Sequence, residues 1–226
     1  SSAASDVYKR QVYGGTQDND SFGGPSRTKN RSGIRNSDWF VTTGGDGFQV
    51  RVDPSDPNTL YTMSQYAGIM RYDKSNGEKI GIQPQPDEGE AALRWNWDSP
   101  LIISPHNTER LYFAANFLFQ SDDRGDTWRK ISPELTRDED RNKMKVMGKV
   151  WSVDAIFKNV FTSPLGTIVA LDESRLQKGF LVVGTDDGLV RISRDNGLSL
   201  EKYEDFPGVP KKAYVTDVIT SKHDIN

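Results

Sequence analysis

An internal repeat is the feature of this sequence that most constrains its fold. Residues 68–77 (GIMRYDKSNG), 116–125 (NFLFQSDDRG) and 188–197 (GLVRISRDNG) align without gaps, and each reads as a β-strand that runs into a turn. Their spacings are 48 (116 − 68) and 72 (188 − 116) residues. The first spacing is close to the length of a repeating unit of four strands, and the second equals one such unit plus an insertion.

The segments upstream of the repeat complete an antiparallel pattern. Residues 48–61 and 101–112 each contain two short β-branched or aromatic runs joined by a polar turn, and Asp-Pro, Pro-Asn, Asn-Gly and Asp-Gly pairs bound these runs. We therefore predict an all-β chain, a partial β-propeller of about four incomplete four-stranded antiparallel blades. The expected units are a partial blade at 12–45, blades at 46–93, 94–135 and 163–213, and a partial blade at 214–226, with an insertion at 131–162.

The insertion changes character along its length. Residues 133–145 are dense in both charges, which predicts a solvated loop with one helical turn, whereas residues 150–157 are mostly apolar. We expect the apolar half to fold back over one face of the array. Insertions of this kind commonly build a binding face in repeat proteins.

Composition excludes several classes of function. The chain has 226 residues, a net charge of −3, no cysteine and two histidines, His106 and His223. An acidic balance argues against a nucleic-acid partner, and the missing cysteines exclude disulfides, zinc–thiolate sites and thiol nucleophiles. We predict no cofactor and no metal. The apolar runs, such as residues 179–184, are far shorter than the roughly 20 residues of a membrane-spanning helix.

Both ends of the chain look unlike the rest. Residues 1–11 match no strand or helix period, and residues 6–11 (DVYKRQ) resemble the translation of an adapter used in preparing sequencing libraries. We expect residues 1–11 to be a non-native segment, the alternative being a native flexible terminus. Residues 214–226 begin a pattern that occurs twice earlier, so we expect the chain to be a piece of a larger propeller.

The most specific motif is SDDRGDTW at residues 121–128. It resembles the Asp box of bacterial neuraminidase repeats at all five fixed positions, which are Ser121, Asp123, Gly125, Thr127 and Trp128. In such a turn the Ser and Asp side chains bond backbone amides, glycine supplies a positive φ and the indole fastens the hairpin to its neighbour. We expect this carboxylate to be structural because its own turn occupies it.

A second copy of the motif is less complete. Ser193, Asp195 and Gly197 keep the first three fixed positions, while Ser199 replaces Thr and Leu200 replaces Trp. Residues 72–77 keep little beyond the turn.

Together with GGTQDN at 14–19, GGDGF at 44–48, RWNWD at 94–98 and GTDDG at 184–188, these motifs resemble a family of large secreted bacterial proteins with neuraminidase-type or sortilin-type repeats, often labelled glycosyl hydrolases. The resemblance covers nearly all of residues 12–226. It implies a propeller of seven or more blades, a secreted or periplasmic location, and partners that include the remaining blades and a glycan or peptide. It does not imply an activity, because related propellers include sialidases, xyloglucanases, peptide receptors and assembly factors.

The resemblance suggests where a reaction could take place. No motif supplies the arginine cluster and tyrosine of a sialidase. A xyloglucanase-like propeller uses two facing carboxylates, and Asp46, Asp98 and Asp154 are the candidates for one of them. Tryptophans that could stack on a sugar lie beside these acids in the sequence, namely Trp95, Trp97 and Trp151. The structural alternative is that these residues fill and cap blade edges.

A polar turn supplies the remaining candidates. Gln17, Asp18 and Asn19 could contact a ligand, the alternative being an ordinary Asx-type turn. The sequence thus favours a non-catalytic propeller module that binds protein, peptide or glycan. Its competitor is a glycoside hydrolase whose second carboxylate lies outside this chain.

Overall fold

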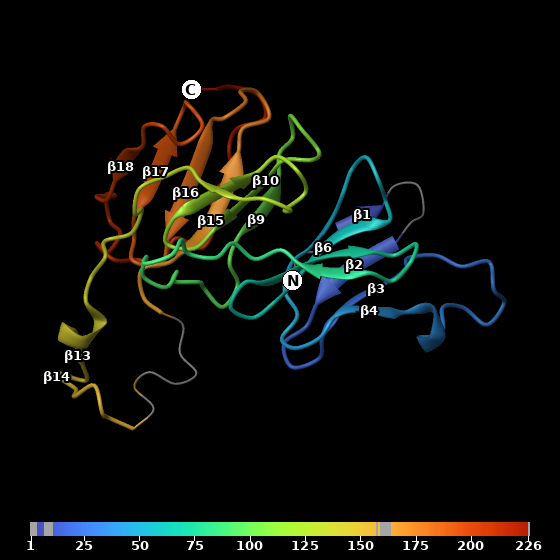
Figure 1. Ribbon diagram of the computed structural model, residues 1–226, viewed down its shortest axis with the longest axis horizontal. Coiled ribbons are helices and arrows are strands. Elements are labelled where there is room, and N and C mark those ends of the chain that lie inside the picture. The colour runs from blue at the N-terminus through green and yellow to red at the C-terminus, as the bar shows by residue number, and fades with distance from the viewer. Residues whose placement is uncertain (1–3, 7–10, 157, 159–163, 226) are drawn as a thin grey trace.

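The computed structural model describes residues 4–6, 11–156, 158 and 164–225, and within them the chain is built from four four-stranded antiparallel sheets. In each sheet the strands are hydrogen-bonded in chain order. The predicted all-β, partial-propeller fold is confirmed (Figure 1). The strands of the four sheets are β1 (Ala4–Asp6), β2 (Gln11–Gly15), β3 (Ser21–Pro25) and β4 (Phe40–Thr43); β5 (Val50–Val52), β6 (Thr59–Ser64), β7 (Gly68–Asp73) and β8 (Lys79–Gly81); β9 (Leu101–Ile103), β10 (Leu111–Ala114), β11 (Leu118–Ser121) and β12 (Arg129–Lys130); β15 (Ile168–Glu173), β16 (Leu181–Thr185), β17 (Val190–Ser193) and β18 (Glu201–Tyr203).

The first strands of neighbouring sheets lie next to each other. β1 contacts β5, and β9 contacts β15. The first strand of each sheet is therefore the inner one, and the later strands lie progressively further out, as in a propeller.

Apolar clusters fill the spaces between successive sheets. The first joins Tyr13 to Val50 and Leu60, the second joins Tyr61 and Met63 to Leu101 and Phe113, and the third joins Tyr112 and Leu118 to Ile168 and Leu181. Each fully buried side chain of this size contributes about 1.5–3 kcal/mol. Because each cluster uses residues of two sheets, one sheet alone could not bury its face.

A directional contact, here called the latch, also joins successive sheets. The turn after the third strand of each later sheet reaches back to the previous sheet. Lys74 Nζ donates to Tyr13 Oη at 2.6 Å, Arg124 Nε donates to Asp53 Oδ2 at 2.9 Å, and Asn196 Oδ1 accepts from Tyr112 Oη at 2.7 Å.

The two ends of the chain differ from the sequence expectation. Residues 1–11 match no strand period in the sequence, yet β1 pairs with β2 in the register Ala4↔Tyr13, which gives the first sheet four strands. The origin of this segment stays a prediction. Residues 214–225, expected to start another blade, form no strand, although Val215 N donates to Thr185 O at 3.1 Å and so lies against the fourth sheet.

The insertion between β12 and β15 reverses the expected roles of its halves. Leu135 and Thr136, in the charged half, are buried against the sheets. The described residues of the apolar half instead carry exposed side chains. The hairpin of β13 (Lys145–Val146) and β14 (Lys149–Val150), which joins the two halves, lies apart from the four sheets (Figure 1). Leu135 joins the apolar cluster between the third and fourth sheets, and contacts with Arg94 and Asp187 hold the loop there. Charge density alone reveals neither. The helical turn expected in the charged half corresponds to η2 (Arg141–Lys143); the other short turn, η1 (Asn36–Asp38), precedes β4.

Candidate functional site at the loop end

The strand order divides the array into two ends. The hairpin between the second and third strands of a sheet and the connection to the next sheet emerge at one end, here called the loop end. The other two hairpins of each sheet emerge at the opposite end, here called the turn end. The Asp-box-like residues belong to the turn end, since they join the third and fourth strands. Most candidate ligand residues belong to the loop end.

A hollow of about 470 Å³ at the loop end brings two of the predicted residues together. It is lined by Gly15, Gln17, Gly47, Phe48, Gln49, Arg51 and Asp98. Arg51 also lines a larger hollow of about 640 Å³ along the inner strands, so the two adjoin. Gln17 comes from the β2–β3 hairpin and Asp98 from the segment before β9, about 80 residues apart in the chain.

Asp98 brings a carboxylate to the hollow. Its Oδ1 accepts from Gln49 Nε2 at 3.4 Å, and Gln49 Oε1 accepts from Arg51 Nη2 at 2.9 Å. Burial raises the pKa of Asp98, while the hydrogen bond from Gln49 and the charge of Arg51 oppose that rise. Burial likewise lowers the pKa of Arg51, which stays charged at neutral pH.

Tyr214 is within electrostatic range of this carboxylate. The pKa of Tyr214 is raised, mainly by burial and further by the charges of Asp186 and Asp98. A hydrogen bond with Asn96 opposes the rise. The Asn96 amide in turn donates to Thr167 Oγ1 at 2.9 Å. The Asn96 side chain is thereby bonded to the residue that precedes β15 of the fourth sheet.

The polar turn at Gln17, Asp18 and Asn19 is fastened to the next sheet. Asp18, in a left-handed conformation at φ 62°, donates its amide to Asp46 Oδ1 at 2.8 Å. Asn19 Nδ2 donates to Gln17 O at 3.3 Å. The buried Asp46 therefore holds a loop in place, and its amide is bonded by Gln65 Oε1 at 2.9 Å. These contacts support a structural role for Asp46, and only Gln17 of the turn lines the hollow.

The three candidate tryptophans lie in different surroundings. Trp95 stacks on Phe113 with ring centroids 4.9 Å apart, inside the core between the second and third sheets. Trp97 makes an edge contact with Tyr66 at 4.6 Å. Trp151 lies in the insertion together with the exposed Asp154, and neither lines the hollow. None of the three tryptophans lines the hollow that contains Asp98.

At the turn end, residues 121–128 form a closed set of hydrogen bonds. Asp123 accepts from Ser121 Oγ at 2.7 Å and from the Thr127 amide at 2.9 Å, and the Gly125 amide donates to Ser121 Oγ at 2.8 Å. Trp128 Nε1 donates to Ile82 O of the previous sheet at 2.7 Å.

The second copy has the same bonds in spite of its substitutions. Asp195 accepts from Ser193 Oγ at 2.8 Å and from the Ser199 amide at 2.9 Å, and the Gly197 amide donates to Ser193 Oγ at 2.8 Å. Both carboxylates are occupied by their own turns, which supports the expectation of a structural role.

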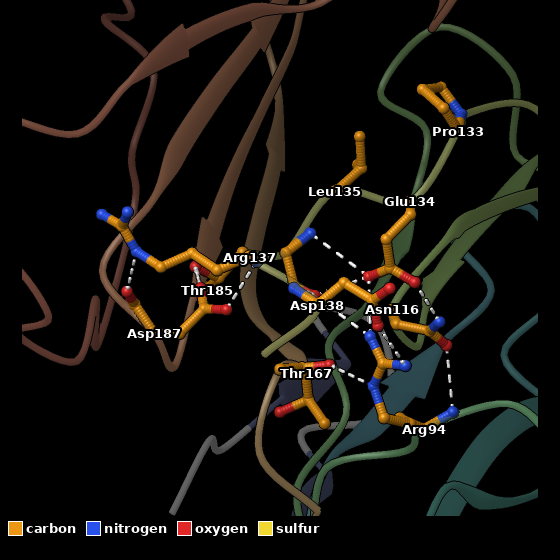
Figure 2. A network of polar contacts seen from close by, with 12 residues as sticks. Arg94, Asn116, Pro133, Glu134, Leu135, Arg137, Asp138, Thr167, Thr185 and Asp187 are labelled. Atoms are coloured by element: carbon orange, nitrogen blue, oxygen red, sulfur yellow. Dashed lines mark hydrogen bonds and ion pairs between the residues drawn. The ribbon is translucent and has the colours of Figure 1, made fainter. Parts of the chain in front are cut away.

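A polar network fixes the loop that follows β12, between the third and fourth sheets (Figure 2). Arg94 bonds Glu134 Oε1 at 2.9 Å and pairs with Asp138 Oδ1 at 3.1 Å, and Glu134 also accepts from Asn116. Arg137 binds Asp187 with its backbone amide at 2.7 Å. Residues 134–138 are therefore fixed next to the loop-end hairpin of the fourth sheet.

Sequence reasoning missed Phe48, Gln49, Arg51 and Tyr214. A signal for two of them exists, because Gln49 and Arg51 alternate with the buried Val50 at the start of an inner strand and so point to the same face. Tyr214 carries no such signal, because its surroundings come from residues about 30 and 120 positions away.

No three His, Cys, Asp or Glu residues in the described part of the chain are placed to hold a metal ion. Within those same ranges, no helix has the length and apolar character needed to cross a membrane.

Comparison with known proteins gives a fold and no family. No protein-family model matches the chain, and no curated protein matches it.

Solved structures do match. The chain is similar to the extracellular domain of BT4673, a candidate one-component system from B. thetaiotaomicron (TM-score 0.57, 12% identity, 94% of this chain and 24% of that one). It is also similar to an ancestral GH74 enzyme, with a TM-score of 0.54 and 14% identity over 88% of this chain and 23% of that one. A third similar structure is the GH74 xyloglucanase from Xanthomonas campestris, with a TM-score of 0.53 and 12% identity over 88% of this chain and 29% of that one. The chain thus spans about a quarter of the length of the structures it matches, and identities this low establish the fold alone.

Proposed function

We propose that this chain is a non-catalytic, glycan-binding part of a larger propeller. The observation that carries the proposal is the convergence of Gln17, Gln49 and Asp98 with the partly buried Phe48 on one hollow at the loop end. The proposed remaining blades would complete the ring, and a secreted or periplasmic location fits the extracellular domain among the similar structures.

The chemistry of the hollow suits a sugar. Amide and carboxylate groups can accept and donate hydrogen bonds to several hydroxyls, and an aromatic ring offers an apolar face for a pyranose. Arg51 is held by Gln49 Oε1 and, through its Nε, by Leu101 O at 3.2 Å, so it stabilises the site more than it attracts an anion. The ligand class that fits best is a neutral oligosaccharide.

The test is titration calorimetry of the 226-residue chain with a xyloglucan heptasaccharide and with cello- and mannohexaose. We expect binding of at least one, with a loss of about tenfold in Asp98→Asn and in Gln17→Ala. Asp154→Asn is the matched control, because Asp154 is exposed and lies away from the hollow, and it should bind normally. Absence of binding by a folded chain, or equal loss in the control, would contradict the proposal.

A second candidate is hydrolysis by two carboxylates. Burial raises the pKa of Asp98, which is the direction of shift that a general acid needs. The partner acid would belong to another blade of the propeller. The test therefore uses the complete propeller: reducing-end release from xyloglucan that is abolished in Asp98→Asn would replace the binding proposal, whereas binding without product would exclude hydrolysis.

A further inference from the structure

The hairpin of β13 and β14 carries an unusual concentration of exposed apolar side chains. Met147 at its tip is 94% exposed, and Ile156 beyond it is 85% exposed. The large apolar side chains exposed in this part of the insertion are Val146, Met147, Val150, Trp151, Val153 and Ile156. The hairpin projects from the body of the molecule (Figure 1), in keeping with the exposure of these side chains.

Basic residues alternate with these apolar ones. Residues 141–158 contain Arg141, Lys143, Lys145, Lys149 and Lys158 against a single acid, Asp154, in a chain whose net charge is −3. Of the three acids just before this segment, Asp138 pairs with Arg94 and Glu139 with Lys212, and only Asp140 pairs with a base of the segment, Lys143. Within the described residues, no carboxylate pairs with Lys145 or Lys149.

The conformation of the hairpin is fixed from within. Met147 and Gly148 both have positive φ, 55° and 79°, as a two-residue hairpin turn requires. Trp151 Nε1 donates to Val146 O at 3.0 Å, and Lys149 Nζ lies 4.7 Å from the centre of the Trp151 ring. The apolar tip and its lysines are thus held in one conformation, so binding would lose little further conformational entropy.

We propose that this hairpin binds an anionic lipid surface, with Met147 and its apolar neighbours entering the interface and the lysines contacting headgroups. The shape favours lipid over a protein partner. A stable protein interface takes about 800 Å² from each side, whereas a two-residue tip on a two-stranded hairpin offers a narrow convex point. Such a point can enter a lipid interface, where tryptophan and lysine are favoured and each basic residue near an anionic surface adds to binding.

The test uses the absence of cysteine from the sequence. Met147→Cys, labelled with an environment-sensitive NBD fluorophore, is mixed with vesicles of 30% phosphatidylglycerol in phosphatidylcholine and with pure phosphatidylcholine at 100 mM salt. We expect a blue shift and a rise in emission with the anionic vesicles, and at least tenfold weaker binding to the neutral ones. Leu198→Cys, at a position 89% exposed at the turn end, is the matched control and should not respond.

Two unlabelled variants, followed by vesicle co-sedimentation, separate insertion from general attraction. Met147→Asp and the double variant Lys145→Glu/Lys149→Glu should each lose at least tenfold in affinity, while Lys178→Glu, at another exposed lysine, should bind normally. No shift of the label, unchanged binding of Met147→Asp, or equal loss in Lys178→Glu would overturn the proposal. So would binding to soluble polyglutamate with no binding to vesicles, which would point to an acidic protein partner.

Discussion

Buried acids that bridge two sheets show how single residues hold this array together. The Asp53 carboxylate is fully buried and lies between its own loop, through Ser55, and Arg124 of the following sheet. Burial alone would raise the pKa of Asp53, but the hydrogen bonds from Ser55 and Arg124 outweigh it and lower the pKa. The charged form is therefore the stabilising one.

Arg124→Ala should lower the free energy of unfolding by about 2 kcal/mol, because it leaves a buried carboxylate without its cation. Since the folded pKa of Asp53 is depressed, this contribution is fully present above about pH 4 and is lost as the pH falls through the folded pKa. Urea denaturation at pH 7 and pH 3.5 measures both effects. Arg129→Ala, which removes an exposed pair with Asp122, should change stability by less than about 0.5 kcal/mol; an equal effect would refute the argument.

At this scale the sequence predicted part of the candidate site. Asp98 and Gln17 were recognised because acids and amides beside turns and aromatics are typical of ligand contacts. Gln49 and Arg51 were missed, since their importance depends on the packing of the second sheet against the third. Asp46 cannot be told from Asp98 by sequence, because a loop amide 28 residues away decides its role.

At the level of structural elements, side-chain hydrogen bonds hold the loop of residues 134–138, which is not part of a β-sheet. Glu134 accepts from Arg94, Asn116 and Thr136, while the Leu135 amide donates to Asn116 O at 3.1 Å. The loop should therefore be as ordered as the sheets only while Glu134 is charged and present.

Glu134→Ala should raise the hydrogen-exchange rates of the Leu135 and Thr136 amides by about tenfold, equivalent to about 1.4 kcal/mol of local stability. Glu139→Ala, which removes an exposed pair with Lys212, is the control. Exchange resolved by mass spectrometry or NMR makes the comparison. If both variants exchange alike, the network does not hold the loop.

Strands and hairpins were predicted well where turn residues and short runs of β-forming residues determined them. Each sheet repeats short β-rich runs between Gly, Asn, Asp and Pro, and this local pattern is enough to place hairpins. The roles of the two halves of the insertion were predicted wrongly, because the position of residues 134–138 depends on Arg94 and Asp187, about 40 and 50 residues from the residues they bind.

On the scale of the whole molecule, four sheets do not close a ring. The inner strands β5, β9 and β15 border the 640 Å³ hollow with Val52, Ile102 and Leu171 among its lining. A closed propeller would cover both outer faces of such an array and the strand edges beside its axis.

The isolated 226-residue chain should consequently associate or be marginally stable. We expect sedimentation velocity to show a rising mass between about 5 and 100 μM, and a thermal midpoint that depends on concentration. The Met147→Asp variant should behave in the same way, because the association uses the open faces and not the hairpin. A sharp, reversible transition that is independent of concentration would contradict this expectation.

The latch between sheets has a consequence for the order of synthesis. In all three cases the later sheet supplies the reaching side chain, and the buried tyrosine or acid that receives it belongs to the earlier sheet. When Lys74, Arg124 or Asn196 leaves the ribosome, its receiving surface has therefore already been made. Each blade can dock on a finished neighbour as it emerges, so the array suits growth from the amino terminus one blade at a time.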